Sequence, residues 1–294
     1  MTQLANQQTI ELSGKWKALG IQREFDPGPA WRRRIALLSH AGFGKTTWIS
    51  SNPRTLVLDF EDGAADVVCP AAHRISIRSV KQATEVLKEL VTFGSDPQRP
   101  FDVIAFDTLD SWVEMAIQNF CATQKIVDIG DFGARGAGYA RVRTPLFQGL
   151  DSIWRAGYGW ICTLHLSRTT VTTGKTERTV VEPALSESFR KAIFKRCQCL
   201  LYAERRDVPV IVPTLNPKTG KPYVDEKGKD RQHNTGETTT EYRIEMSTPL
   251  SDDRKARVPL ATDLVVTETN GWQVYVDAYD TAVRNLQERT GESR

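Results

Sequence analysis

Blocks of hydrophobic and polar residues follow one another along the first two thirds of the chain and predict alternating strands and helices. Short apolar runs typical of buried strands cover residues 35–38, 55–60, 101–107 and 157–165. Apolar positions at helical spacing follow Ser79 and predict a capped amphipathic helix over residues 79–93, and a second helix is expected over residues 111–123. Strands alternating with helices predict an α/β fold with a mostly parallel central sheet flanked by helices.

The last third of the chain has a different pattern. A buried strand is expected over residues 197–203, and residues 208–215 and 241–246 alternate like the strands of an antiparallel sheet. Residues 216–240 between them are polar and predict a long exposed excursion. A final helix is expected over about residues 276–289. We therefore predict three regions: an N-terminal arm (1–30), the core (31–206) and a C-terminal β extension with the last helix (207–294).

The junction after the first predicted strand has the pattern of a phosphate-binding loop. At Gly42 and Gly44 no bulky side chain prevents backbone N–H groups from converging on an anion. Lys45 can reach the β- and γ-phosphates, and the Thr46 hydroxyl can hold Mg²⁺. Ser39 replaces the first glycine of the consensus, and the alternative is a glycine-rich turn before an ordinary helix. The predicted nucleotide contacts are Ala41, Gly42, Phe43, Gly44, Lys45, Thr46 and Thr47.

Acidic residues follow two of the predicted strands. Asp107 ends an apolar strand in the Walker B arrangement, so Thr46 and Asp107 are the predicted metal residues. Glu61 follows the strand over residues 55–60 and is the candidate for orienting or deprotonating the attacking water. A charge cluster at a helix N-terminus is the alternative for Glu61. His165 ends the next strand, where it can sense the γ-phosphate or be an ordinary satisfied histidine.

Charge is distributed unevenly along the chain. Residues 130–206 contain 13 Lys and Arg against 6 Asp and Glu, a local net charge of +7, so the rest of the chain carries −4 of the total of +3. Residues 129–142 combine glycines, aromatics and arginines, which predicts a pliant loop suited to single-stranded nucleic acid. A solvated basic surface and a simple flexible connection remain the alternatives.

Composition excludes several classes of protein. The chain is 40% hydrophobic and 26% charged, ordinary values for a globular protein, and no apolar run is long enough to span a bilayer. The first residues are too polar for a secretory signal. Five scattered cysteines indicate reduced thiols. We expect a cytoplasmic protein with no membrane partner.

The order of these motifs resembles that of RecA-like P-loop ATPases, and within them the phage nucleotide-binding proteins of the Sak-type single-strand annealing group. The resemblance covers about residues 32–257 and rests on residues 42–46, 58–63 and 104–108 and on the strand ending in His165. It implies a RecA-like fold that uses ATP and Mg²⁺, with Glu61 activating water and His165 coupling the γ-phosphate to DNA. It also implies that Lys255 and Arg257 reach into the neighbouring subunit's site. The implied DNA loops are residues 130–142 and 167–181, and the candidate contacts are Arg135, Tyr139, Arg141, Arg168, Lys175 and Arg178.

The function implied by the resemblance is that of a DNA-dependent ATPase in phage-type recombination or strand annealing, located in the bacterial host if phage-encoded. The implied catalytic residues are Lys45, Glu61, Asp107, His165, Lys255 and Arg257. Expected partners are single-stranded DNA, further copies of the chain in a filament or ring, and a single-strand DNA-binding protein. The alternatives are a ring helicase or helicase loader of the same fold, and a nucleotide-gated DNA-binding switch with negligible hydrolysis.

Overall fold

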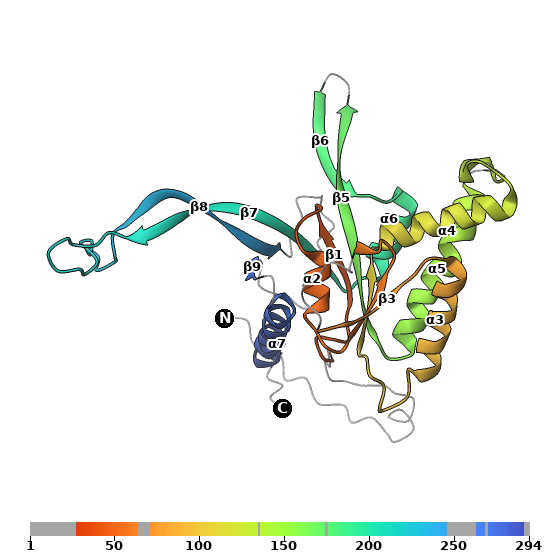
Figure 1. Cartoon of the computed structure of the whole chain (residues 1–294), viewed down its shortest axis with the longest axis horizontal. Helices are drawn as coiled ribbons and strands as arrows, with labels where there is room; N and C mark the ends of the chain where they lie inside the picture. The colour runs from red at the N-terminus through yellow and green to blue at the C-terminus, as the bar shows by residue number, and fades with distance from the viewer. Residues whose placement is uncertain are drawn as a thin grey trace, which may run out of the picture.

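A nine-stranded sheet with helices on both faces forms the centre of the molecule (Figure 1). The computed structural model describes residues 28–63, 71–134, 136–173, 176–245, 263–267 and 270–290. The strand order is β3-β2-β4-β5-β1-β7-β8-β9, and β6 pairs with β5 outside this path. The strands are β1 (Arg34–Ser39), β2 (Thr55–Asp59), β3 (His73–Ser76), β4 (Val103–Asp107), β5 (Gly159–Thr173), β6 (Thr176–Pro183), β7 (Cys199–Pro213), β8 (Gln232–Glu245) and β9 (Asp263–Val266).

The sheet is parallel from β3 to β7 and antiparallel where β8 and β9 are added. β5 lies between β1 and β4, so the strand of the phosphate loop and the Walker B strand are not direct neighbours. The predicted α/β fold class, a mostly parallel central sheet with flanking helices and C-terminal antiparallel additions, is confirmed.

Alternation along the buried strands builds two cores, one on each face of the sheet. In β1, Ile35 and Leu37 point to one face while Ala36 and Leu38 point to the other. The first face is covered by α2 (Lys45–Ser50) and α7 (Gly271–Thr290), and the second by α3 (Val80–Phe93), α4 (Leu109–Gln124), α5 (Ala137–Arg155) and α6 (Glu187–Arg196) (Figure 1). None of the described helices is both long and apolar enough to cross a membrane.

Aromatic rings join α2 to the last helix. Trp48 is 3% exposed and packs edge-on against Trp272, with ring centroids 5.7 Å apart, and against Tyr275 at 6.1 Å. Burying such large rings contributes much of the packing free energy on this face. The helix that follows the phosphate loop is therefore fixed by α7, which begins at Gly271, earlier than the expected residue 276.

The loop predicted over residues 167–181 is wrong, because these residues form an antiparallel hairpin of β5 and β6. Thr169 to Thr173 and Thr176 to Val181 are rich in β-branched residues, which favour strands even where little surface is buried. The hairpin extends beyond the body of the sheet (Figure 1).

The pliant loop predicted over residues 129–142 is also wrong. A 3₁₀ turn, η2 (Ile129–Asp131), is followed by α5, which begins at Ala137. Gly136 caps this helix with a φ of +78°, and a Cβ at Gly138 would lie 2.5 Å from the Ile129 carbonyl oxygen. These two glycines allow a helix start and a close backbone contact rather than flexibility.

A second hairpin, β7–β8, projects in a different direction from β5–β6, to the left in Figure 1. The strands expected over residues 197–203 and 208–215 form the single strand β7, buried over Cys199–Ala203 and largely exposed beyond. The expected excursion over residues 216–240 is shorter than predicted, because β8 already begins at Gln232.

Candidate functional site

The carboxyl ends of β1, β2 and β4 meet β5 at one edge of the sheet. The pairings Asp59↔Asp107 and Ser39↔His165 align the four strands there. His165 does not end its strand as predicted, because β5 continues to Thr173. Ligand sites of open α/β sheets lie outside this edge. The fold therefore brings together the parts of the chain that carry Lys45, Glu61, Asp107 and His165.

The phosphate loop has the backbone that its glycines permit. Gly42 and Gly44 adopt φ values of +82° and +93°, a region that other residues rarely enter. Phe43 between them is only 5% exposed and packs against Tyr242, with ring centroids 5.9 Å apart. The buried ring anchors the loop while Ala41, Gly42 and Gly44 stay exposed to an incoming anion.

Lys45 is buried at the start of α2 and is held by oxygen atoms of the loop. Its Nζ donates to Ser39 Oγ at 3.2 Å, to the Ser39 carbonyl at 3.5 Å and to the His40 carbonyl at 3.4 Å. Burial lowers the pKa of Lys45, and the nearby carboxylates of Asp107, Asp110 and Glu61 act in the opposite direction. Ser39, the departure from the consensus, thus gives the lysine a side-chain acceptor that glycine would lack.

Asp107 lies at the centre of a network of hydroxyl groups. Thr46 Oγ1 donates to Asp107 Oδ2 at 2.7 Å, and Thr163 Oγ1 donates to Asp107 Oδ1 at 2.5 Å. Burial raises the pKa of Asp107, while the hydrogen bonds from Thr163 and Thr46 favour the charged form. A hydroxyl and a carboxylate in contact are oxygen ligands of the kind Mg²⁺ takes beside phosphates, so the two predicted metal residues fit that ion.

Glu61 follows β2 at the same edge. Its Oε1 accepts hydrogen bonds from Thr108 Oγ1 at 2.6 Å and from Ser111 Oγ at 2.5 Å. Thr108 also caps α4, because it accepts from the Ser111 N–H at 3.4 Å. Glu61 is therefore oriented by the start of α4, an arrangement that a base acting on water requires.

His165 is paired with Asp110 on α4. The distance from His165 Nδ1 to Asp110 Oδ2 is 2.9 Å, and the His165 backbone N–H donates to Asp110 Oδ1 at 3.3 Å. The hydrogen bond to Asp110 raises the pKa of His165. His165 Nδ1 also lies 3.7 Å from Glu61 Oε1, and one ligand atom from each of the three side chains lies within 4.8 Å of the others. The hydrogen bonding of the imidazole accounts for this grouping. Sequence reasoning missed Asp110, whose only local signal was its place after the Walker B aspartate.

Among the described residues, the predicted nucleic-acid residues lie on two separate parts of the fold, the β5–β6 hairpin and α5. Arg168 is exposed on β5, and Arg178 lies on β6. Tyr139 and Arg141 lie on α5, where Tyr139 packs against the core. Arg135, Lys175, Lys255 and Arg257 lie outside the described residues.

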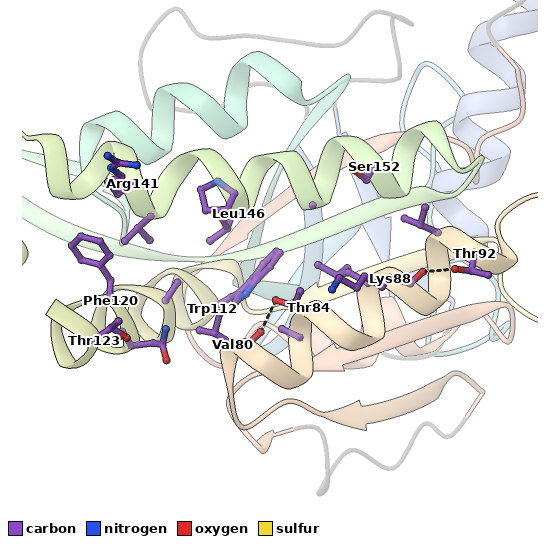
Figure 2. Close-up of a pocket in the computed structure, with 18 residues that line it drawn as sticks. Val80, Thr84, Lys88, Thr92, Trp112, Phe120, Thr123, Arg141, Leu146 and Ser152 are labelled. Atoms are coloured by element: carbon purple, nitrogen blue, oxygen red, sulfur yellow. Dashed lines mark hydrogen bonds between the residues drawn. The ribbon is translucent and has the colours of Figure 1, made fainter.

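Arg141 lines a cavity of about 750 Å³ between α3, α4 and α5, shown with Trp112 and Lys88 in Figure 2. The walls are mostly apolar, and the described lining contains Lys88 and Arg141 but no carboxylate. None of the predicted phosphate or metal residues lines it. The cavity is therefore separate from the candidate site.

A smaller cavity of about 120 Å³ adjoins the phosphate loop. Gly42, Phe43, Gly44, Thr47 and Trp48 form one wall, and Tyr242, Val266 and Thr267 form the other. Sequence reasoning missed the second wall, which comes from β8 and the end of β9, far along the chain. These residues place apolar and aromatic surface next to the glycines that would hold phosphate.

A family model described as an AAA domain matches residues 32–240, more than half of the chain. No curated protein matches. Similar solved structures include the RadB recombinase, with TM-score 0.40 and 11% identity over 82% of this chain and 90% of that one. A KaiC-like protein from the hyperthermophilic archaeon Pyrococcus horikoshii OT3 has TM-score 0.40 and 9% identity over 81% and 87%. TM-scores this low carry no argument about activity or partners.

Proposed function

The chain belongs to the AAA domain family, and from this premise we propose that it is an ATPase that binds single-stranded DNA in phage-type recombination or strand annealing. DNA stimulates its hydrolysis of ATP. One observation carries the proposal: β5 passes through the candidate ATP site at Thr163 and His165 and continues without a break into the exposed hairpin that carries Arg168. A single strand thus joins the two activities.

The ATP half of the proposal rests on the loop and the carboxylates at the sheet edge. Backbone N–H groups around Gly42 and Gly44 hold the phosphates, and Lys45 turns from Ser39 toward the β- and γ-phosphates. Thr46 and Asp107 would hold Mg²⁺, which would neutralise charge on the phosphates. Glu61 orients the attacking water and accepts its proton. The small cavity beside Tyr242 receives the nucleoside end of ATP.

The DNA half of the proposal rests on the β5–β6 hairpin. Arg168 brings positive charge to a ribbon that extends from the edge holding His165, and Arg178 lies on the paired strand β6. Lys175, outside the described residues, is the third proposed contact. Positive side chains on an exposed ribbon bind phosphates without reading sequence. Tyr139 and Arg141 are left out of this contact because both belong to a packed helix. Lys255 and Arg257 keep their proposed role of completing the site of a neighbouring copy in a filament or ring.

The test is the ATP turnover of the full chain with and without single-stranded DNA, beside duplex DNA of the same length. We expect single strands to raise turnover and duplex to raise it less, because the hairpin is proposed to bind flexible strands. Glu61→Gln separates the alternatives: in a nucleotide-gated switch this variant would keep DNA binding and biological activity. Unwinding of a forked duplex would favour a helicase. Turnover and gel mobility that do not respond to any polynucleotide would overturn the DNA half.

A further inference from the structure

The first turn of α4 contacts both side chains that flank the proposed position of the γ-phosphate. Thr108 and Ser111 donate to Glu61 Oε1, while Asp110 between them contacts the ring and the backbone N–H of His165. The contact between Asp110 and His165 joins residues 55 positions apart. Neither pattern nor spacing assigned Asp110 a role.

We propose that Asp110 is a positioning residue that fixes the orientation and the protonated nitrogen of His165, leaving Nε2 to face the phosphates. This inference rests on the proposed function, since it describes how the same site prepares its histidine. Both carboxylate oxygens of Asp110 are engaged by His165, one by Nδ1 and one by the backbone N–H. Two contacts from one carboxylate fix both the ring and the part of the strand that carries it.

Burial distinguishes Asp110 from an ordinary acidic residue in the first turn of a helix. Its side chain is 12% exposed, while that of His165 is 30% exposed. An acid that only complemented the helix dipole would stay in solvent, where its charge costs no desolvation. A carboxylate turned inward toward an imidazole keeps Nδ1 as the protonated nitrogen.

Three charged groups face His165 from the surrounding elements: Asp110 of α4, Glu61 after β2 and Lys45 of α2. The hydrogen bond to Asp110 makes the largest contribution and raises the pKa of His165, and the charge of Glu61 acts in the same direction. Burial and the charge of Lys45 lower that pKa. Removing the Asp110 carboxylate should therefore lower the pKa of His165.

The direct test is a ¹⁵N titration of the histidines in the nucleotide-free full chain, wild type and Asp110→Asn. The chain has four histidines, so the spectrum of His165→Gln identifies the signal of interest. We expect Asp110→Asn to lower the pKa of His165 and to shift the neutral ring from Nδ1–H toward Nε2–H. Glu114→Gln, on the exposed face of the same helix, is the matched control and should change neither. An unchanged pKa and tautomer in Asp110→Asn would overturn the inference.

The kinetic test is the pH profile of kcat for the same variants. We expect Asp110→Asn to lower kcat by about 10- to 100-fold with a smaller change in KM, because a misplaced group costs chiefly in the transition state. The alkaline limb of the profile should move to lower pH. If Asp110→Asn does not fold, Asp110→Ser, which is compatible with a helix start, takes its place with the same expectations. A wild type without ATPase activity would remove the proposed function, while the titration would still decide the role of Asp110. If the wild type is active and Asp110→Asn has the same pH profile of kcat, the positioning role of Asp110 is overturned.

Discussion

The central sheet and the two hairpins share the strands β5 and β7 and differ in what surrounds them. In β5, Trp160 to Leu164 are buried between β1 and β4, whereas the residues beyond Leu166 pair only with β6. β7 changes in the same way after Ala203. At the edge, the side chains of Thr46, Asp107 and Thr163 fix one another through hydrogen bonds. In the outer part of the β7–β8 hairpin most side chains are at least partly exposed to solvent. The edge suits a ligand of constant shape such as a triphosphate, and the hairpins suit a flexible polymer.

The largest effect should come from the edge. Lys45→Ala removes the buried cation proposed to contact the β- and γ-phosphates, so we expect ATP turnover to fall on the order of 10³-fold. Steady-state phosphate release measures this. Lys81→Ala, an exposed lysine of α3, is the control and should keep wild-type turnover. Equal turnover in Lys45→Ala and the control would remove the edge from the ATP site.

The second prediction compares the inner and outer halves of β7. Leu201→Ala should cost about 2 to 5 kcal/mol in the free energy of unfolding, because Leu201 is fully buried. Ile211→Ala should cost less than about 0.5 kcal/mol, because Ile211 is 54% exposed. Urea denaturation of both variants measures the difference. Similar costs at the two positions would mean that the outer half of the hairpin is part of the cooperative core.

The third prediction concerns the β5–β6 hairpin. Arg168→Ala should weaken binding to single-stranded DNA and reduce the slope of log K against log salt by about one, as expected for one lost phosphate contact. Turnover without DNA should stay unchanged. Arg155→Ala, exposed at the end of α5, is the control. An unaltered salt slope in Arg168→Ala would remove this arginine from the DNA interface.

The smallest effect is a pH dependence of stability at the edge. The pKa of His165 is raised by its hydrogen bond to Asp110, so the folded state binds the proton more tightly than the unfolded state. The stabilising contribution of His165 to the free energy of unfolding is fully present below the pKa of the unfolded state, near 6.5. It is lost as the pH rises through the pKa of the folded state. His165→Gln should therefore be more destabilising at about pH 5.5 than at about pH 9 in urea titrations without nucleotide. An equal loss of unfolding free energy in His165→Gln at both pH values would contradict this prediction.

The parts of the fold that the sequence predicted are those in which burial leaves a pattern. The strands ending in Ser39 and Asp107, and the helix capped by Ser79, lie within a residue or two of their predicted positions. The β5–β6 hairpin was missed because its sequence is rich in threonine, lysine and arginine and has few apolar residues from which strands could be recognised. The glycines of residues 130–138 led to the wrong prediction of a pliant loop for another reason. Glycine occurs both where the backbone is flexible and where it packs closely, so the residue type alone does not distinguish the two.

The candidate site likewise contains residues that the sequence predicted and residues that it did not. The glycines, Lys45 and Thr46 are contiguous, so their joint chemistry could be predicted from spacing alone. The bonds from Ser39 to Lys45 and from Asp110 to His165 depend on how separate segments meet, which no local pattern contains. Tyr242 and Val266 beside the loop were missed for the same reason.

The packing of Trp48 against Trp272 provides an intrinsic spectroscopic probe. The Trp48 indole is on the helix that starts with Lys45 and touches a second indole from the far end of the chain. Any rearrangement of the phosphate loop that tilts this helix alters the coupling of the two rings, and with it their emission and near-ultraviolet circular dichroism. Nucleotide titrations can therefore be followed on the unlabelled chain, with Trp272→Phe as the variant that removes the contribution of the Trp48–Trp272 pair.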